Sequence, residues 1–257
     1  MAATPKEAVQ DADLVILCAP VGAMQEIAAA MAPGLKPGAI ISDVGSVKRF
    51  VITALGGHLP KTVELIPAHP IAGTEHSGPE AGFAELFEKR WCILTPGDGA
   101  SEASVAKLRT LWERCGAKVD VMTPEHHDIV LAVTSHAPQL IAYTMVGVAD
   151  DMGRVTEAEV INYSAAGFRD FTRIAASDPT MWRDVFLSNR DATLEILGRF
   201  TEELFALQRA IRTGDGEALH AYFTRTRAIR RGILDAGQDV DTPDFGRRTA
   251  SDPSDEE

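Results

Sequence analysis

The apolar stretch LVILCA at residues 14–19 decides the fold class of this chain. Six consecutive apolar residues are typical of a short β-strand that is buried on both faces of its sheet. Pro20 ends this strand, and residues 21–31 follow with the pattern of a helix. A buried strand that leads directly into a helix is the repeating unit of a parallel α/β sheet.

The same alternation continues along the first half of the chain. Further strands are predicted at residues 39–43, 63–68, 91–95 and 118–122, and helices at residues 46–55 and 102–114. Ser46 is expected to cap the first of these helices. The alternation predicts a parallel sheet with helices on its faces.

The strand signal disappears after Thr123, which can cap a helix that begins at Pro124. The helical pattern then extends to residue 150, with a kink expected at Pro138. Two more helices are predicted, at residues 178–212 and 215–234.

These patterns divide the chain into three parts. We predict a Rossmann-like α/β domain at residues 1–122, an all-helical domain at residues 123–238, and a disordered acidic tail at residues 239–257.

Composition excludes several classes of protein. The 257 residues carry a net charge of −12, which disfavours binding to nucleic acid or to an anionic membrane surface. No apolar run reaches the roughly 18 residues of a membrane span, and the N-terminus lacks the pattern of a signal peptide. Three scattered cysteines without a CxxC pair fit a reducing cytoplasm and argue against a structural zinc site.

Three strands end in turns that could bind a ligand, because ligands of open parallel sheets lie beyond the carboxyl ends of the strands. The turns are APVG at residues 19–22, DVGS at residues 43–46 and HPIAG at residues 69–73. His69 is the candidate for proton chemistry, since an imidazole can accept a proton near neutral pH. A hydrogen-bonded structural histidine is the alternative, and its position alone does not separate the two.

The helical half contains further candidates, each with a plainer alternative. His126, His127 and Asp128 are adjacent, which disfavours a metal site on a helix and favours a polar network near the interdomain cleft. His136 and Gln139 share a helical face that points either into the cleft or toward another helix. Three arginines among aromatic residues could form an anion pocket or ordinary surface ion pairs, namely Arg169, Arg173 and Arg183.

Five motifs taken together resemble the prephenate/arogenate dehydrogenase family. They are DVGSVK at residues 43–48, HPIAGTEHSG at 69–78, SHAP at 135–138, GFRDFTRIA at 167–175 and DPTMWRD at 178–184. The resemblance covers most of residues 13–235. It implies a cytoplasmic homodimer, joined through the helical domain, in which NAD or NADP serves the oxidative decarboxylation of prephenate, arogenate or both in tyrosine biosynthesis.

The resemblance also implies roles for single residues. His69 would accept the hydrogen bond of the substrate's C4 hydroxyl, Ser46 would support His69 beside the nicotinamide, and Arg173 would bind a substrate carboxylate. The residues expected to line or gate the substrate pocket are His136, Gln139, Thr74, Glu75, Asp170 and Trp182. Those expected at the cofactor are Ala19, Pro20, Val21, Asp43, Gly45 and Ser46.

Two departures from the family pattern shape the expectations. Many prephenate-using members have histidine where this chain has Gln139, which predicts broad use of prephenate and arogenate. The family's first strand carries a Gly-x-Gly-x-x-Gly loop that holds the pyrophosphate, and this sequence has no such motif. We therefore expect the first βαβ unit to be missing and dinucleotide binding by the chain as written to be weak.

Two alternatives stay open. One is a dimerising fragment without activity. The other is a different dehydrogenase with a Rossmann domain and a helical domain, such as a β-hydroxyacid dehydrogenase. That family uses a catalytic lysine in its helical domain, and residues 124–150 contain no lysine, which disfavours this second alternative.

Overall fold

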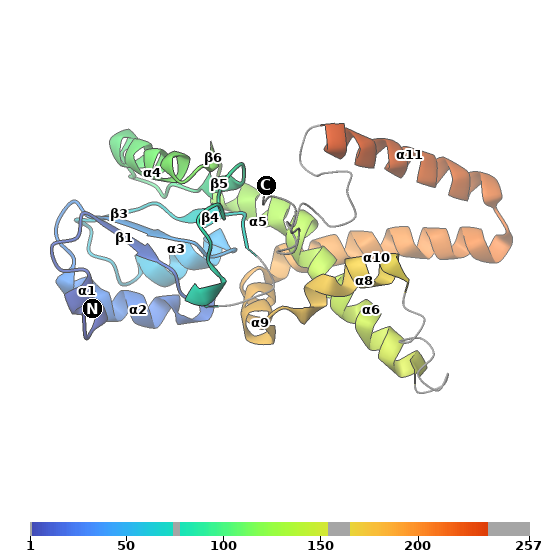
Figure 1. Cartoon of the computed structure of the whole chain (residues 1–257), viewed down its shortest axis with the longest axis horizontal. Coiled ribbons are helices and arrows are strands. Elements are labelled where there is room, and N and C mark those ends of the chain that lie inside the picture. The colour runs from blue at the N-terminus through green and yellow to red at the C-terminus, as the bar shows by residue number, and fades with distance from the viewer. Residues whose placement is uncertain (1, 74–77, 154–164, 236–257) are drawn as a thin grey trace, which may run out of the picture. The chain divides into compact units, whose positions relative to one another are not determined.

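The computed structural model describes residues 2–73, 78–153 and 165–235 (Figure 1). The chain divides into two compact units, Met1–Leu197 and Gly198–Glu257. The predicted acidic tail at residues 239–257 lies outside the described residues, as do Thr74 and Glu75. The predicted domain boundary near residue 122 stays a prediction.

The first unit contains two small sheets. One has the order β1-β2-β3 and is parallel, with β1 at Leu14–Leu17, β2 at Ile40–Asp43 and β3 at Glu64–Leu65. The other has the order β4-β5-β6, with β4 at Ala68–Pro70, β5 at Trp91–Leu94 and β6 at Lys118–Val121. β5 and β6 are parallel, but β4 runs antiparallel to β5.

The α/β fold class is confirmed, and two details of the strand prediction are wrong. The strand predicted at residues 63–68 consists of β3 and β4, separated by Ile66 and Pro67. Pro67 has no N–H to donate to a ladder, and its carbonyl oxygen accepts a hydrogen bond from Thr95 N at 2.9 Å. The chain therefore passes from the first sheet to the second at this proline, and the expectation that all strands run parallel fails at β4.

Helices pack on these sheets through two apolar clusters. The first cluster joins β1 and β2 to α2 (Met24–Met31) and α3 (Lys48–Gly56), with Met24, Met31, Ile41 and Leu55 fully buried. The second joins β5 to α4 (Glu102–Arg114) around Leu94, Leu108 and Trp112. Short elements connect or precede these, namely α1 (Pro5–Ala8), η1 (Val21–Ala23), η2 (Ala32–Gly34) and η3 (Pro79–Ala81).

The rest of the described chain is helical. It comprises α5 (Pro124–Leu131), the π-helical turn η4 (Ala132–His136), α6 (Ala137–Gly153), α8 (Ala166–Thr172), η5 (Arg173–Ala176), α9 (Pro179–Ser188), α10 (Arg190–Thr213) and α11 (Gly216–Asp235). The π-helical turn lies directly before Pro138, where a kink was predicted. As predicted, Thr123 caps α5, through a hydrogen bond of 3.2 Å from His126 N.

The helix predicted at residues 178–212 is two helices. Asp178 caps α9 by accepting a 2.7 Å hydrogen bond from Met181 N. Asn189 leaves the helical conformation, with φ −112° and ψ 37°, and so separates α9 from α10. Gly214 ends α10 with φ 69°, a left-handed conformation that glycine adopts without steric cost.

The helical run Pro124–Met152 is long and apolar enough to cross a membrane, by length and composition. The core helix of a soluble protein passes the same test. This run contains the buried polar side chains of His127, Asp128, His136 and Gln139, which bind partners inside the protein. Lipid hydrocarbon offers no such partners, so these contacts disfavour a membrane span, and 33% of the apolar window is buried inside the protein.

Candidate active site

The turns after β1 and β2 meet at the carboxyl end of the first sheet. Leu17 pairs with Asp43, and Val44 N donates to Leu17 O at 3.3 Å, so the two strands end at the same level. A Cβ at Gly45 would lie 2.8 Å from Val21 Cγ1, so the turns pack too closely for any other residue there. Of the expected cofactor residues, Pro20 is exposed and Ala19, Gly45 and Ser46 are half-buried.

Val21 and Asp43 have buried side chains, so neither can offer its side chain to a cofactor. Asp43 instead forms an ion pair of 2.6 Å with Lys48, and both side chains have no exposed surface. Lys48 Nζ also donates to Ala68 O at 2.6 Å, and Asp43 accepts from Gly45 N at 2.7 Å and Ala68 N at 3.2 Å. Burial lowers the pKa of Lys48 and raises that of Asp43, and the ion pair opposes both shifts.

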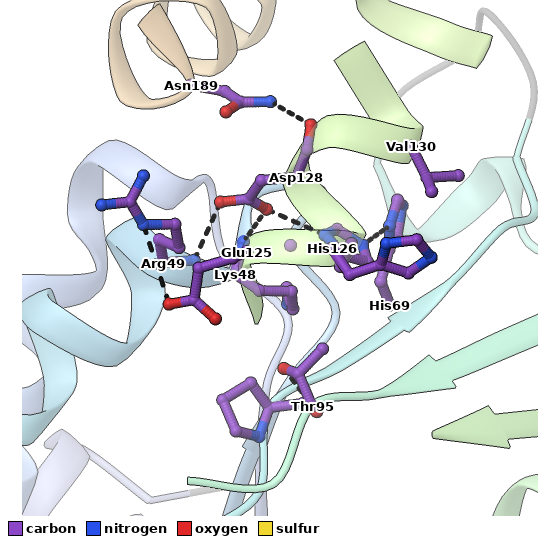
Figure 2. Close-up of polar contacts among 12 residues, drawn as sticks. Lys48, Arg49, His69, Thr95, Glu125, His126, Asp128, Val130 and Asn189 are labelled. Atoms are coloured by element: carbon purple, nitrogen blue, oxygen red, sulfur yellow. Dashed lines mark hydrogen bonds and ion pairs between the residues drawn. The ribbon is translucent and has the colours of Figure 1, made fainter. Parts of the chain in front are cut away.

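Asp128, at the start of the helical region, caps α3. Its carboxylate accepts hydrogen bonds from Lys48 N at 2.8 Å and Arg49 N at 3.1 Å (Figure 2). The expectation that Ser46 caps this helix is wrong. The N-cap position is Val47, whose side chain has no oxygen, so a carboxylate distant in sequence satisfies the free N–H groups.

Asp128 also connects to His69 through a second histidine. Asp128 Oδ1 lies 2.8 Å from His127 Nδ1, and His127 Nε2 lies 2.8 Å from His69 Nδ1. Both histidines are buried, and His69 retains 8% of its surface. The two described residues Ser46 and His69 form no hydrogen bond with each other, so the direct partner of His69 is His127.

Burial and charge keep His69 neutral. Burial lowers its pKa well below the usual value, and the positive charge of Lys48, together with His127 and His136, lowers it further. Burial also lowers the pKa of His127, although Asp128 opposes that shift. A neutral imidazole can accept a hydrogen bond or a proton from a ligand.

Asn189 joins this network to His136. Its Nδ2 donates to Asp128 O at 2.8 Å and lies 3.1 Å from His136 Nδ1. Burial lowers the pKa of His136 to about 4. A neutral His136 that accepts from Asn189 at Nδ1 carries its proton on Nε2.

Two buried N–H groups near His136 have no hydrogen-bond partner within the part of the chain that the structure describes. They are His136 Nε2 and Trp182 Nε1. The two rings pack edge to face with their centroids 6.1 Å apart. Buried donors of this kind are expected to bind a polar ligand atom or water.

The other expected substrate residues lie on neighbouring helices. Gln139 Nε2 donates to Ile174 O at 2.7 Å, and Tyr143 Oη donates to Ser177 O at 3.0 Å, so α6 anchors the segment that begins at Arg173. Arg173 is half-buried at the start of η5, and Asp170 is exposed on α8. Hydrogen bonds through His127, Asp128 and Asn189 link His69 to His136, and the ring of His136 contacts that of Trp182.

Asp128 also lines a cavity of about 520 Å³, together with residues that include Arg49, Glu125 and Arg190. His69 does not line it, so we do not place the substrate there. Within residues 2–73, 78–153 and 165–235, no group of three His, Cys, Asp or Glu side chains is arranged to hold a metal ion.

The structure has the polar network predicted for His127 and Asp128, but the sequence did not indicate that this network supports His69, and it did not indicate Asn189. The adjacent His-His-Asp residues after a predicted N-cap were the available signal. The residue that caps α3 could not be found from local sequence, because Lys48 and Asp128 are 80 residues apart.

Comparisons with known proteins identify the family. The model described as prephenate dehydrogenase, nucleotide-binding domain, matches residues 1–121, and that of the prephenate dehydrogenase dimerization domain matches residues 123–225. A cyclohexadienyl dehydrogenase of Zymomonas mobilis is 45% identical over 89% of this chain and 78% of its own length. A prephenate dehydrogenase of Bacillus subtilis is 34% identical over 88% of this chain.

A solved structure has a similar fold over most of the chain. The prephenate dehydrogenase of Aquifex aeolicus has a TM-score of 0.80 and 35% identity, over 86% of this chain and 78% of that one. A second structure of it, in complex with hydroxyphenyl propionate and NAD+, has a TM-score of 0.77. This chain spans 78% of the Zymomonas relative and 61% of the Bacillus one. With both of the family's domains matched, the chain belongs to the prephenate dehydrogenase family.

Proposed function

We propose that the protein catalyses the oxidative decarboxylation of prephenate, arogenate or both, with NAD+ or NADP+, in tyrosine biosynthesis. The products are 4-hydroxyphenylpyruvate and tyrosine, respectively, with carbon dioxide and the reduced cofactor. The observation that carries the proposal is the buried His69 in β4, whose Nδ1 lies 2.8 Å from His127 Nε2 and whose pKa is held well below its usual value by burial.

His69 has the chemistry that the reaction needs. Its imidazole accepts the hydrogen bond of the C4 hydroxyl and can take the hydroxyl proton as the C4 hydrogen leaves with its electron pair. A nicotinamide cofactor, when bound, supplies the hydride acceptor. Formation of the aromatic ring drives the loss of the carboxylate, so the protein's task is orientation and the handling of one proton.

The residues at the strand ends fit one part of such a cofactor. Pro20 is exposed and Ser46 is half-buried at the carboxyl ends of β1 and β2, where ligands of open parallel sheets bind. These residues would hold the nicotinamide end. The choice between NAD+ and NADP+ rests on the relatives, one of which was solved with NAD+.

The helical residues fit the anionic end of the substrate. His136 Nε2 and Trp182 Nε1 are buried donors, and Arg173 lies in the segment that Gln139 anchors. The Gln139 amide nitrogen donates to Ile174 O, which leaves its oxygen as the group that can accept from the ammonium of arogenate. We therefore propose that both substrates are used, as the name of the cyclohexadienyl dehydrogenase relative also implies.

Three further parts of the proposal concern assembly, partners and location. We propose a homodimer, because residues 123–225 match the family's dimerization domain. We place the protein in the cytoplasm, since Cys18, Cys92 and Cys115 are all free. The net charge of −12 disfavours nucleic acid and membrane surfaces as partners.

Substitution of His69 by asparagine tests the function. Reduction of NAD+ or NADP+ is followed by absorbance with each substrate, and His69→Asn is expected to lower kcat by about 10²-fold or more. His126→Asn is the matched control, because His126 is exposed beside the network. An unchanged kcat in His69→Asn would remove the base role, and no turnover by the wild type at saturating cofactor would favour the inactive fragment.

The same assay tests specificity. Comparable kcat/KM values are expected for prephenate and arogenate. A hundredfold preference for prephenate would contradict the role given to Gln139.

A further inference from the structure

The hydrogen bonds around His69 determine which of its two nitrogens carries the proton. Asp128 Oδ1 accepts from Lys48 N at 2.8 Å, so the carboxylate acts as an acceptor toward its neighbours. His127 Nδ1, also 2.8 Å from Asp128 Oδ1, must then be the donor. A neutral His127 with its proton on Nδ1 has an unprotonated Nε2.

The next hydrogen bond follows from the first. His127 Nε2 lies 2.8 Å from His69 Nδ1 and can only accept, so His69 Nδ1 must donate. A neutral His69 with its proton on Nδ1 keeps its lone pair on Nε2. Burial favours the neutral form of both rings, in agreement with this assignment.

We propose that His127 and Asp128 are positioning residues that hold His69 as the Nδ1–H tautomer and so direct its Nε2 lone pair toward the substrate. This role rests on the proposed function for its catalytic consequence, but the tautomer itself is a property of the free protein. The arrangement places a histidine between the base and the carboxylate, which extends the orienting hydrogen bond across two rings.

The network also fixes the positions of His127 and Asp128. The carboxylate of Asp128 accepts hydrogen bonds from two backbone N–H groups of α3, those of Lys48 and Arg49. The backbone carbonyl of Asp128 accepts a hydrogen bond from the side chain of Asn189. The ring of His127 packs edge to face on His69, with centroids 5.1 Å apart and an interplanar angle of 64°. A base whose orienting partner is itself fixed at several points loses little rotational freedom when substrate binds.

The tautomer can be measured directly by two-bond ¹H–¹⁵N correlation spectra of protein labelled with ¹⁵N-histidine, at neutral pH and without ligand. Assignment uses the loss of signals in His69→Asn. We expect a protonated Nδ1 and an unprotonated Nε2 for His69 in the wild type. A protonated Nε2 on His69 in the wild type would overturn the proposal.

Two substitutions of His127 separate positioning from packing. His127→Gln can present an amide oxygen near the former Nε2 and is expected to keep the His69 tautomer and most of the wild-type kcat. His127→Leu removes the acceptor and is expected to lower kcat about tenfold or more, with a smaller change in KM, and to increase the Nε2–H tautomer of His69. The exposed neighbour His126→Leu is the control and should match the wild type.

The outcomes are distinct from those that test the function. An equal loss of kcat in His127→Gln and His127→Leu, with an unchanged tautomer in both, would show a role in packing alone and contradict the proposal. The expected tautomer in a wild-type protein without turnover would instead contradict the proposed function. If His127→Leu does not fold, the wild-type spectrum and His127→Gln still decide.

Discussion

His136 is buried as a neutral side chain, and this makes folding stability depend on pH. Burial lowers its pKa to about 4 in the folded protein, whereas an unfolded histidine titrates near 6.5. Between these two pH values the unfolded state binds more protons than the folded state. The contribution of the neutral His136 to folding stability is therefore complete above about pH 6.5 and is lost as the pH falls toward 4. The shift corresponds to about 3 kcal/mol.

Denaturant unfolding at about pH 7.5 and about pH 4.5 measures this loss. His136→Gln should reduce the difference in unfolding free energy between the two pH values, although His69 and His127 still contribute in the same direction. The exposed His126→Gln should retain the full difference. An equal pH dependence in His136→Gln and wild type would contradict the burial of a neutral His136.

Sequence alone proposed His69 and His136 as candidates but could not predict which residues hold them. Local rules placed His69 in the turn after a strand that ends at residue 68, whereas the structure has it inside β4, paired with Ile93. For His127 and Asp128, the same rules considered only that adjacent helical residues do not share a face, which disfavoured a metal site. Their partners come from β4 and α3, and contacts between segments so distant in sequence leave no local pattern.

The α3 helix depends on a buried ion pair at its first residue. Lys48 and Asp43 are both inaccessible to solvent, and each has further hydrogen bonds. Lys48→Met should therefore leave an uncompensated buried carboxylate and destabilise the fold by about 3–5 kcal/mol. Chemical denaturation at neutral pH measures the loss.

A second variant separates the charge from the packing. The double substitution Asp43→Asn with Lys48→Met removes both charges and should be less destabilising than Lys48→Met alone. Arg49→Met is the control, because Arg49 is exposed at the adjacent position. A double variant that loses as much stability as the sum of its single variants would show that the two charges are not coupled.

Sequence predicted the elements better than their ends and pairings. Apolar periodicity predicted the strands and helices because burial imposes it. The break at Pro67 and the antiparallel direction of β4 depend on which strand lies opposite, and the periodicity is the same for either direction. The cap of α3 likewise comes from α5, so Ser46 gave a false local signal.

Within Gly198–Glu257, the described helices expose large apolar side chains. Leu204 is 52% exposed, Ile211 68%, Phe223 55% and Ile229 60%. Phe200, Leu204 and Ile211 are spaced to share one face of α10. An amphipathic sequence predicts such a face but not whether this chain or another covers it, and the match to a dimerization domain favours a second copy.

Leu204→Glu should therefore convert the proposed dimer to a monomer, because it would place a charge in the proposed interface. Sedimentation velocity at micromolar concentration measures the mass of the species. Ala206→Glu adds the same charge at an exposed position about half a turn away on α10 and should remain dimeric. A dimer in Leu204→Glu, or a wild-type monomer, would show that this face of α10 is not the one that joins two chains.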